Sequence, residues 1–357
     1  MNTDQHLILG AISAYIVSSL ALLVYMLSRQ QWAKSVGMPF AFIGCAIQFF
    51  ELVYRCQTSH IWPLTNLYGS LSLFSAMSVV IFIGFAIRYD VWFIGGLVQM
   101  IAAGFLAYAL TWDEGYLPAV PALQSYWIKV HVPLVVTSYA AFMVAFATGL
   151  LYLVKYYGEL RLAHGAAGTT DTPVITGNFG SEPSTYASDL EFAYAHEASS
   201  ARLQGSGSTQ GNADATVLPL PEDAVRVIGS TRESVVLQAA AARGNRFAGW
   251  LITLPPLSKL DILCYRIIAV GLPLLTVGII TGAWWAKEAW GAYWQWDPKE
   301  TAALFSWIVY ASYMHLHTRN SWRGIRSAWL VVFGFATIIF CYLGVNIWIS
   351  GLHSYKT

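Results

Sequence analysis

Charged side chains are scarce in this sequence of 357 residues. They make up 11% of the chain, whereas hydrophobic residues make up 56%. A soluble domain carries roughly 25% charged residues. The charge here is too sparse to cover a water-facing surface, so we expect lipid to surround most of the chain. The net charge of +1 gives no indication of a nucleic-acid partner, and we predict none.

Cysteine is also scarce, and its spacing excludes two kinds of site. The sequence holds four cysteines and no Cys-x-x-Cys pair. A structural zinc site and a thiol pair for covalent attachment of haem to this chain both need such spacing. We therefore interpret the cysteines as small apolar side chains within helices.

Long apolar runs are abundant, and a membrane-spanning helix needs about 20 mostly apolar residues. The sequence predicts an all-α, polytopic membrane helix bundle with about eight transmembrane helices. The shortest run is the seventh, and the second carries two polar residues, Gln48 and Glu51. The predicted spans are Leu7–Leu27, Met38–Tyr54, Tyr68–Ile87, Val91–Leu110, Val130–Tyr152, Ile262–Ala283, Ala302–His317 and Ala328–Ile349.

Basic residues in short loops indicate which side of the membrane each loop faces, because they concentrate on the cytoplasmic side. One set of loops holds Arg29, Lys34, Arg88, Lys155, Arg161, Lys259, Arg266, Arg319, Arg323 and Arg326. The opposite loops and the tail hold only Arg55, Lys129, Lys287, Lys299 and Lys356. We therefore predict that the N- and C-termini both lie outside.

The composition divides the chain into three parts. Residues 1–155 hold the first five predicted transmembrane helices, and residues 259–357 hold the last three with an external tryptophan-rich loop at 284–300. Between them, residues 156–258 form a predicted cytoplasmic insertion, rich in Gly, Ser, Thr and Ala from about residue 163 to 245. Such a composition cannot bury enough apolar surface to offset the entropy of ordering, so we expect it to be largely disordered.

The external loop concentrates the largest aromatic side chains. Five tryptophans fall within 13 residues: Trp284, Trp285, Trp290, Trp294 and Trp296. The loop ends in a predicted helix start, with Asp297 as N-cap, Pro298 at the first helical position and Glu300 completing a capping box. Tryptophan is enriched at membrane interfaces, which is one interpretation of the cluster. The other is an aromatic platform for a large, flat, apolar ligand, and spacing alone does not separate the two.

Histidines near the membrane faces favour the platform. His131 lies near the outer end of the fifth span, and His353 lies just beyond the outer end of the eighth. Two imidazoles at the depth of the tryptophans indicate a planar ligand with a metal at its centre, namely haem. His317 lies at the inner end of the seventh span, and an ionisable residue within a span is a functional candidate by default.

Several motifs resemble those of one family. "WGAYWQWDPKET" (Trp290–Thr301) is similar to the tryptophan-rich WWD signature of the haem-handling membrane proteins of cytochrome c maturation, and most of all to the CcsA/ResC family of System II. "PLTNLYGSLSLFS" (Pro63–Ser75), "YMHLHTR" (Tyr313–Arg319) and "GLHSY" (Gly351–Tyr355) continue the resemblance in order. The sequence departs from the family at Gly69, where many members carry Glu.

The resemblance implies a function and a site. The chain would carry haem b across a bacterial inner membrane and present it on the periplasmic side, for thioether attachment to the Cys-x-x-Cys-His segment of apocytochrome c. His131 and His353 would be the axial ligands and catalytic residues there. The Trp284–Trp296 segment with Asp297 would form the shelf, and His317 would hold a second, intramembrane haem.

The implied partners are a CcsB/ResB-type membrane protein, apocytochrome c and thiol-reducing factors. Together with the CcsB-type protein, the chain would form a holocytochrome c synthase, or haem lyase. Two alternatives remain open: a haem chaperone or exporter of the CcmC type without ligation activity, and a b-type electron-transfer subunit.

Overall fold

A computed structural model of the chain describes residues 3–59, 62, 64, 66–112, 124–167, 241 and 244–349. These residues form helices, and no strand occurs among them, which confirms the predicted all-α fold. The first half holds α1 (Thr3–Ser28), α2 (Gln31–Ser59), α3 (Leu67–Tyr89), the short η1 (Trp92–Ile94), α4 (Gly95–Leu110) and α5 (Tyr126–Ala167). The second half holds α8 (Arg246–Thr253), α9 (Leu257–Trp290), α10 (Pro298–His317), η3 (Asn320–Trp322), α11 (Ile325–Ile339), η4 (Phe340–Gly344) and α12 (Val345–Trp348).

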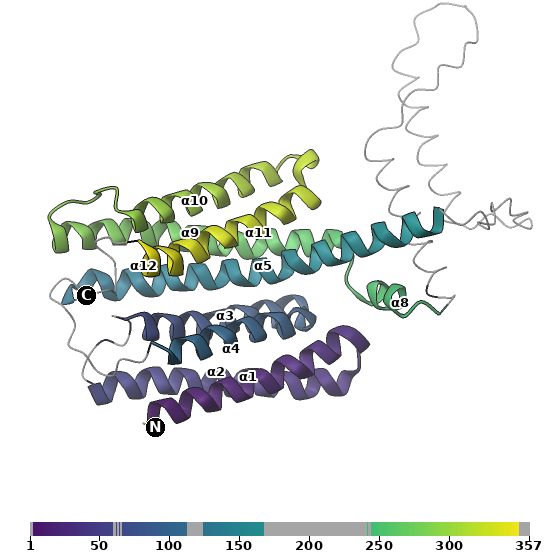
Figure 1. Ribbon diagram of the computed structural model, residues 1–357, viewed down its shortest axis with the longest axis horizontal. Helices are drawn as coiled ribbons and strands as arrows, with labels where there is room; N and C mark the ends of the chain where they lie inside the picture. The colour runs from purple at the N-terminus through teal and green to yellow at the C-terminus, as the bar shows by residue number, and fades with distance from the viewer. Residues whose placement is uncertain are drawn as a thin grey trace, which may run out of the picture.

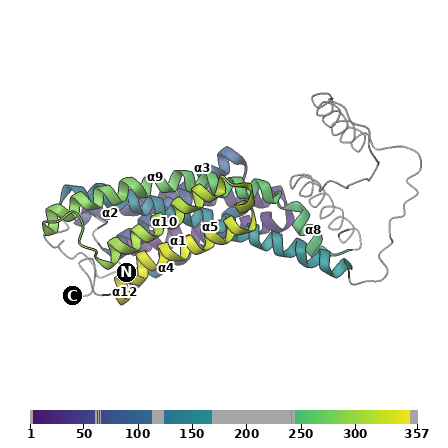
Figure 2. The ribbon, with the colours of Figure 1, turned by 90° about the horizontal axis from the view of Figure 1, so that it is seen from above.

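The long helices lie side by side along a common axis in two groups (Figures 1 and 2). Helices α1–α4 form one group and α9–α12 the other, and α5 runs between them. Helix α5 packs against α3 on one side and against α9 and α11 on the other. It projects past the bundle at one end because its 42 residues measure about 63 Å at the helical rise.

Seven of the described helices are long and apolar enough to cross a membrane, so the chain is a multi-pass membrane protein. The seventh predicted span, Ala302–His317, falls in α10, which is not among these seven helices because charged and histidine residues occupy its ends and lower its mean hydropathy. Its 20 residues still measure about 30 Å, the thickness of the hydrocarbon core. Helix α10 runs alongside α9 and α11 from one end of the bundle to the other (Figure 1).

Small residues allow α5 and α9 to pack closely. Gly278 and Gly282 stand four residues apart on α9, the G-x-x-x-G spacing that brings membrane helices together. A Cβ at Gly278 would lie 2.6 Å from Val135 Cγ2. Farther along the same seam, Ser138 Oγ donates a hydrogen bond of 2.9 Å to the Gly271 carbonyl. The two helices that carry His131 and the tryptophans are thus held in a fixed register.

The described ends of the predicted insertion are helical and contact each other. Helix α5 continues without interruption to Ala167, and α8 packs against α5. Lys155 Nζ donates bonds of 3.0 Å to the carbonyls of Leu251 and Leu254, which lie at the C-terminal end of α8. Residues 168–240 of the insertion lie outside the described residues, so its predicted disorder and the three-part division stay predictions.

Candidate functional site

The end of the bundle where α9 finishes and α10 begins carries the tryptophans, and we name it the tryptophan end. The structure corrects the predicted loop of residues 284–300. Helix α9 continues to Trp290, so Trp284 and Trp285 lie on its last turns, and only residues 291–297 connect it to α10. The physical reason is the run of good helix formers from Ala286 to Ala289, which carries the helix on.

The short connection has an unusual backbone. Gly291 ends α9 with a φ of 82°, in the left-handed region that glycine enters without cost. Trp296 has a φ of 56°, which is rare for a bulky side chain. Its side chain is 71% exposed, so burial of the indole does not explain the conformation. Strained backbone of this kind gathers at functional sites.

The predicted capping box at the start of α10 is confirmed. The Asp297 carboxylate accepts a bond of 3.0 Å from the Lys299 backbone N–H. The Glu300 carboxylate accepts from the backbone N–H of Asp297 at 3.3 Å and of Gln295 at 2.9 Å. Asp297 is 6% exposed and occupied by this cap. Its carboxylate therefore holds the connection in place against the helix.

The tryptophans form three aromatic pairs at this end. Trp285 and Trp290 lie edge to face with ring centroids 4.7 Å apart, and Trp294 and Trp296 do so at 5.7 Å. Trp284 pairs at 4.7 Å with Trp127, which comes from α5. Sequence reasoning did not assign Trp127. The available signal was its spacing, because Trp127 lies four residues before His131 and hence on the same face of the helix.

His131 lies beside these tryptophans, where α5 meets α9. Its ring is roughly parallel to that of Trp285, at 20° with centroids 6.0 Å apart. Its Nδ1 lies 2.8 Å from the Gly278 carbonyl oxygen. A carbonyl only accepts, so Nδ1 carries the proton and the lone pair of the neutral ring is on Nε2. An imidazole that binds a metal is commonly held in this way, through its other nitrogen.

A glycine makes room for this imidazole. A Cβ on Gly282 would lie 2.7 Å from His131 Cε1 and 2.8 Å from Nδ1, closer than real Cβ contacts. The ring can therefore approach the α9 backbone only because residue 282 has no side chain. The structure thus brings His131, Trp285 and Trp290 together, while His353 lies outside the described residues.

His317 lies at the opposite end of the bundle, and its surroundings differ. It is 6% exposed, and its Nε2 lies 2.9 Å from Asp261 Oδ2. Asp261 also accepts bonds from Ser327 Oγ at 2.7 Å and from the Gly324 N–H at 3.4 Å. The ring of Tyr265 stacks on the imidazole at 4.8 Å. The nitrogen that usually binds haem iron is thus engaged by a carboxylate in this conformation.

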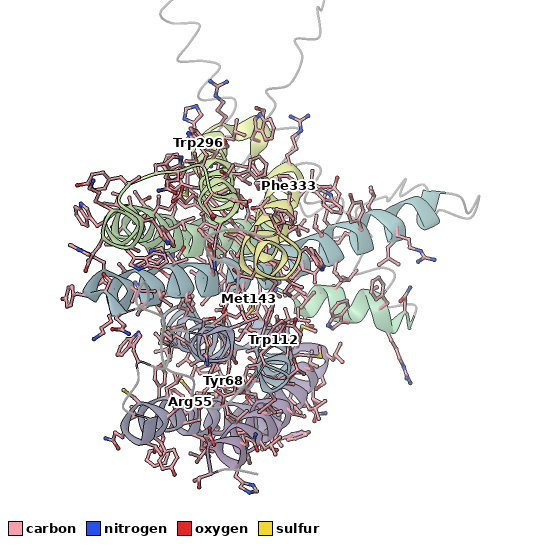
Figure 3. All side chains as sticks on the ribbon, turned by 60° about the vertical axis from the view of Figure 1, so that its left-hand side comes forward. Arg55, Tyr68, Trp112, Met143, Trp296 and Phe333 are labelled. Atoms are coloured by element: carbon pink, nitrogen blue, oxygen red, sulfur yellow. The ribbon has the colours of Figure 1, made fainter. Side chains whose placement is uncertain are left out.

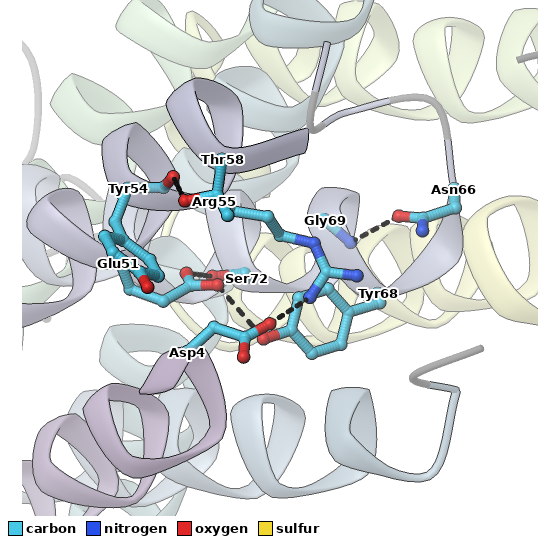
Figure 4. A network of polar contacts seen from close by, with 9 residues as sticks. All are labelled: Asp4, Glu51, Tyr54, Arg55, Thr58, Asn66, Tyr68, Gly69 and Ser72. Atoms are coloured by element: carbon cyan, nitrogen blue, oxygen red, sulfur yellow. Dashed lines mark hydrogen bonds and ion pairs between the residues drawn. The ribbon is translucent and has the colours of Figure 1, made fainter. Parts of the chain in front are cut away.

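The motif of residues 63–75 forms part of a buried polar network between α1, α2 and α3, drawn in Figure 4. Asp4 and Arg55 form an ion pair at 3.1 Å, and the Arg55 guanidinium lies 4.0 Å from the centre of the Tyr68 ring. Tyr68 Oη donates a bond of 3.0 Å to Glu51, and Ser72 Oγ donates one of 3.2 Å. The polar residues of this motif therefore join helices.

The network and the tryptophans lie on different sides of α5. Figure 3 shows Arg55 and Tyr68 on one side, Trp296 and Phe333 on the other, and Met143 of α5 between them. Beside Trp296, an apolar groove of about 590 Å³ lies between α10 and α11. Its lining comprises Pro298, Thr301, Ala302, Phe305, Phe333, Ala336, Thr337 and Phe340.

The sequence profile of a family described as "Cytochrome C assembly protein" matches residues 64–353 of this chain. The chain is 35% identical over 315 residues to "Cytochrome c biogenesis protein CcsA" of Heterosigma akashiwo, which covers 87% of this chain and 81% of that protein. Proteins of the same name from Synechococcus elongatus and Synechocystis sp. are also 35% identical, over 298 and 302 residues. Each match covers 82% of this chain and, respectively, 79% and 80% of the relative.

The chain belongs to the CcsA family. Membership of this family gives the chain a role in cytochrome c maturation, as the resemblance implied. That role implies partner proteins in the same pathway. The matched range starts at residue 64 and so takes in α3 and every later helix. The helices that carry His131 and His317, α5 and α10, and the tryptophan end are therefore part of the region that CcsA proteins have in common with this chain.

Proposed function

We propose that this chain is the haem-binding component of a cytochrome c synthase complex. It carries haem b across the membrane and presents it at the tryptophan end for attachment to the Cys-x-x-Cys-His segment of apocytochrome c. The observation that carries the proposal is the arrangement of His131. Its Nδ1–H is anchored on the Gly278 carbonyl, its Nε2 holds the lone pair, and its ring lies parallel to that of Trp285.

The aromatic pairs supply the apolar surface that a porphyrin needs. Each stacking contact contributes about 0.5–1.5 kcal/mol beyond the burial of area. Trp284 and Trp296 are 44% and 71% exposed, so their rings are accessible to a ligand. The second axial ligand in this proposal is His353, which the family pattern supplies.

The start of α10 is a poor site for the haem propionates. Asp297 is negatively charged and occupied as the cap, and the Lys299 ammonium donates to Asn346 Oδ1 at 2.9 Å. The Lys299 ammonium is thus bonded to a side chain of α12 and not directed at a ligand of the tryptophan end. We therefore assign the propionates no partner at this helix end.

The reaction adds each cysteine thiol across a haem vinyl group. The sulfur bonds to one vinyl carbon, the thiol proton ends on the other, and the C=C double bond becomes single. No net oxidation occurs, so the thiols must arrive reduced, which accounts for the thiol-reducing factors among the proposed partners. The imidazole of His131 holds the iron at a fixed position over the tryptophans, so that the vinyl groups meet the incoming thiols in one orientation.

His317 is proposed as the ligand of a second haem within the membrane, with the opposite ligand from a CcsB/ResB-type partner. In the conformation described here its Nε2 is bonded to Asp261. Ligation through Nε2 therefore requires the imidazole to leave that carboxylate first.

We place the chain in the bacterial cytoplasmic membrane with the tryptophan end facing the periplasm. The support is the distribution of basic residues. The opposite end of the bundle carries Arg29, Arg88 and Arg319, and such residues concentrate on the cytoplasmic side.

The test is co-expression with a CcsB-type protein and an apocytochrome in cells that lack other haem-ligation factors. We expect thioether-linked cytochrome from the wild-type chain, and at least about tenfold less from His131→Ala. Added imidazole should restore part of the yield, because it fills the vacated ligand position. A full yield from His131→Ala without imidazole would refute the proposal. Haem loading without any thioether product would favour a chaperone or exporter of the CcmC type.

A further inference from the structure

The last membrane helix contains a π-helical turn. Element η4 (Phe340–Gly344) joins α11 to α12 and inserts one extra residue into the turn. An extra residue rotates everything after it by about 100° around the helix axis. The turn therefore decides which neighbours the side chains of η4 and α12 face, and single π-turns occur often at functional sites.

The side chains around this turn form a polar chain between the two groups of helices. Tyr342 Oη donates a bond of 3.1 Å to Ser70 Oγ on α3. Asn346 Nδ2 donates one of 2.6 Å to the Tyr342 carbonyl, and Asn346 Oδ1 accepts one of 2.9 Å from Lys299 Nζ on α10. Lys299 lies two residues after Asp297, the cap that ends the tryptophan connection.

These groups are buried, so their geometry is strongly constrained. Ser70 and Asn346 are each 4% exposed, and Tyr342 is 5% exposed. A buried polar group that loses its partner destabilises the protein by its full desolvation cost. The amide of Asn346 is the central member, because its nitrogen bonds to η4 while its oxygen bonds to α10.

We infer that Asn346 is a positioning residue for haem at the tryptophan end. Through Lys299 it ties α12, the last described helix before the tail that carries His353, to the start of α10 behind the tryptophans. The chain therefore leaves the bundle at a set place relative to His131. The inference also gives Ser70, in the motif of residues 63–75, a role in the site. It rests on the proposed function and adds the residues that fix where the described chain ends relative to His131.

The experiment measures haem per chain and the spin state of ferric haem in the purified complex by absorption and electron paramagnetic resonance. In the Asn346→Leu variant we expect haem retention to fall about tenfold, as the loss of a buried bond implies. The haem that remains should shift from low spin to high spin, and imidazole should restore the low-spin signal. If Asn346→Leu lost haem only because the protein misfolds, added imidazole would not restore the low-spin signal.

A milder variant covers the case in which Asn346→Leu does not fold. Ser70→Ala removes the bond from Tyr342 at the far end of the polar chain, together with the bond of 3.0 Å that Ser70 Oγ donates to the Leu67 carbonyl of its own helix. We expect about a twofold to threefold loss of haem. Its control is Ser75→Ala, which removes a buried bond between α3 and α4, that of 2.9 Å to the Ala102 carbonyl. The control should keep the wild-type haem content and spin state.

The outcomes separate the inference from the proposed function. A wild-type complex that binds no low-spin haem would refute the proposed function. A wild-type complex with low-spin haem, alongside an Asn346→Leu protein that folds with the same content and spectrum, would overturn the inference alone. Equal losses from Ser70→Ala and Ser75→Ala would overturn it as well.

Discussion

Two histidines on neighbouring helices use opposite nitrogens. His131 bonds through Nδ1 to a backbone carbonyl of α9, whereas His317 bonds through Nε2 to the carboxylate of Asp261. The first arrangement puts the lone pair of the neutral ring on Nε2, and the second engages Nε2 in a buried ion pair or hydrogen bond. Residue type and depth in the membrane are therefore insufficient to identify a haem ligand. The nitrogen through which each imidazole bonds to the protein has to be compared as well.

The largest effect on the difference between the two histidines is expected when the carboxylate bonded to His317 is removed. Asp261→Ala removes the carboxylate partner of the buried imidazole and the acceptor of the Gly324 N–H. It also removes one of the two acceptors of Ser327 Oγ, whose other acceptor is the Gly324 carbonyl at 2.8 Å. We expect the free energy of unfolding in mild detergent to fall by about 3–5 kcal/mol. The control is Asp90→Ala, because the Lys34–Asp90 pair is 2.7 Å long but Asp90 is 71% exposed. Its loss should be at most about 1 kcal/mol, and equal losses would contradict a structural role for Asp261.

The glycine beside His131 offers a second test. Gly282→Ala places a Cβ 2.7 Å from the imidazole, which must then move away from α9. We expect about a tenfold loss of haem retention, measured by pyridine haemochrome on the purified protein. Gly271→Ala is the matched control, because its Cβ would lie 2.9 Å from Phe142 on the same α5–α9 seam but far from His131. The control should lose about 1–3 kcal/mol of stability and keep its haem. A Gly282→Ala protein with full haem would show that the position of the ring is unimportant.

A smaller effect is expected from the aromatic pairs. Trp294→Ala removes one member of the Trp294–Trp296 pair and should weaken haem retention roughly twofold to tenfold. Trp32→Ala is the comparison, since Trp32 is exposed on α2 at the opposite end of the bundle. Titration of the two purified variants with haem measures the difference. Equal affinities would show that the tryptophans belong only to the membrane interface.

The smallest effect is expected at Asp297, where two variants distinguish the role of the side chain as helix cap from the role of its negative charge. Asp297→Ala should cost about 1 kcal/mol of stability, whereas Asp297→Asn should cost little, because asparagine caps a helix as well as aspartate does. Thermal unfolding checks both variants, and haem content is measured in parallel. If Asp297→Asn kept its stability but lost its haem, the carboxylate would have a function beyond that of the cap.

The sequence predicted the features that depend on local chemistry. Apolar runs predicted the helices, and Asp297, Pro298 and Glu300 predicted the start of α10 correctly. The end of α9 was predicted too early. The cluster of tryptophans was interpreted as a loop, although the good helix formers between Trp285 and Trp290 favour a continued helix. Trp127 was missed because its position depends on tertiary packing. It comes from α5, and only the packing of α5 on α9 brings it to Trp284.

The partners of the histidines could not be predicted from the sequence. Gly278 lies 147 residues from His131, and Asp261 lies 56 residues from His317. Which nitrogen bonds to which partner depends on the register of packed helices, and no local pattern encodes that register. The polar network of Glu51, Tyr68 and Ser72 was equally hidden, although Glu51 was noted as a polar residue within an apolar span.

The most direct test of the account is to identify the nitrogen bound to iron at the tryptophan end. The measurement is pulsed electron paramagnetic resonance of low-spin ferric haem in the purified complex supplied with ¹⁵N-imidazole. We predict no ¹⁵N coupling in the wild-type protein, where the proposal places His131 on the iron, and a clear ¹⁵N coupling in His131→Ala. A low-spin spectrum in His131→Ala that matches the wild type and shows no coupling to the added imidazole would contradict the account.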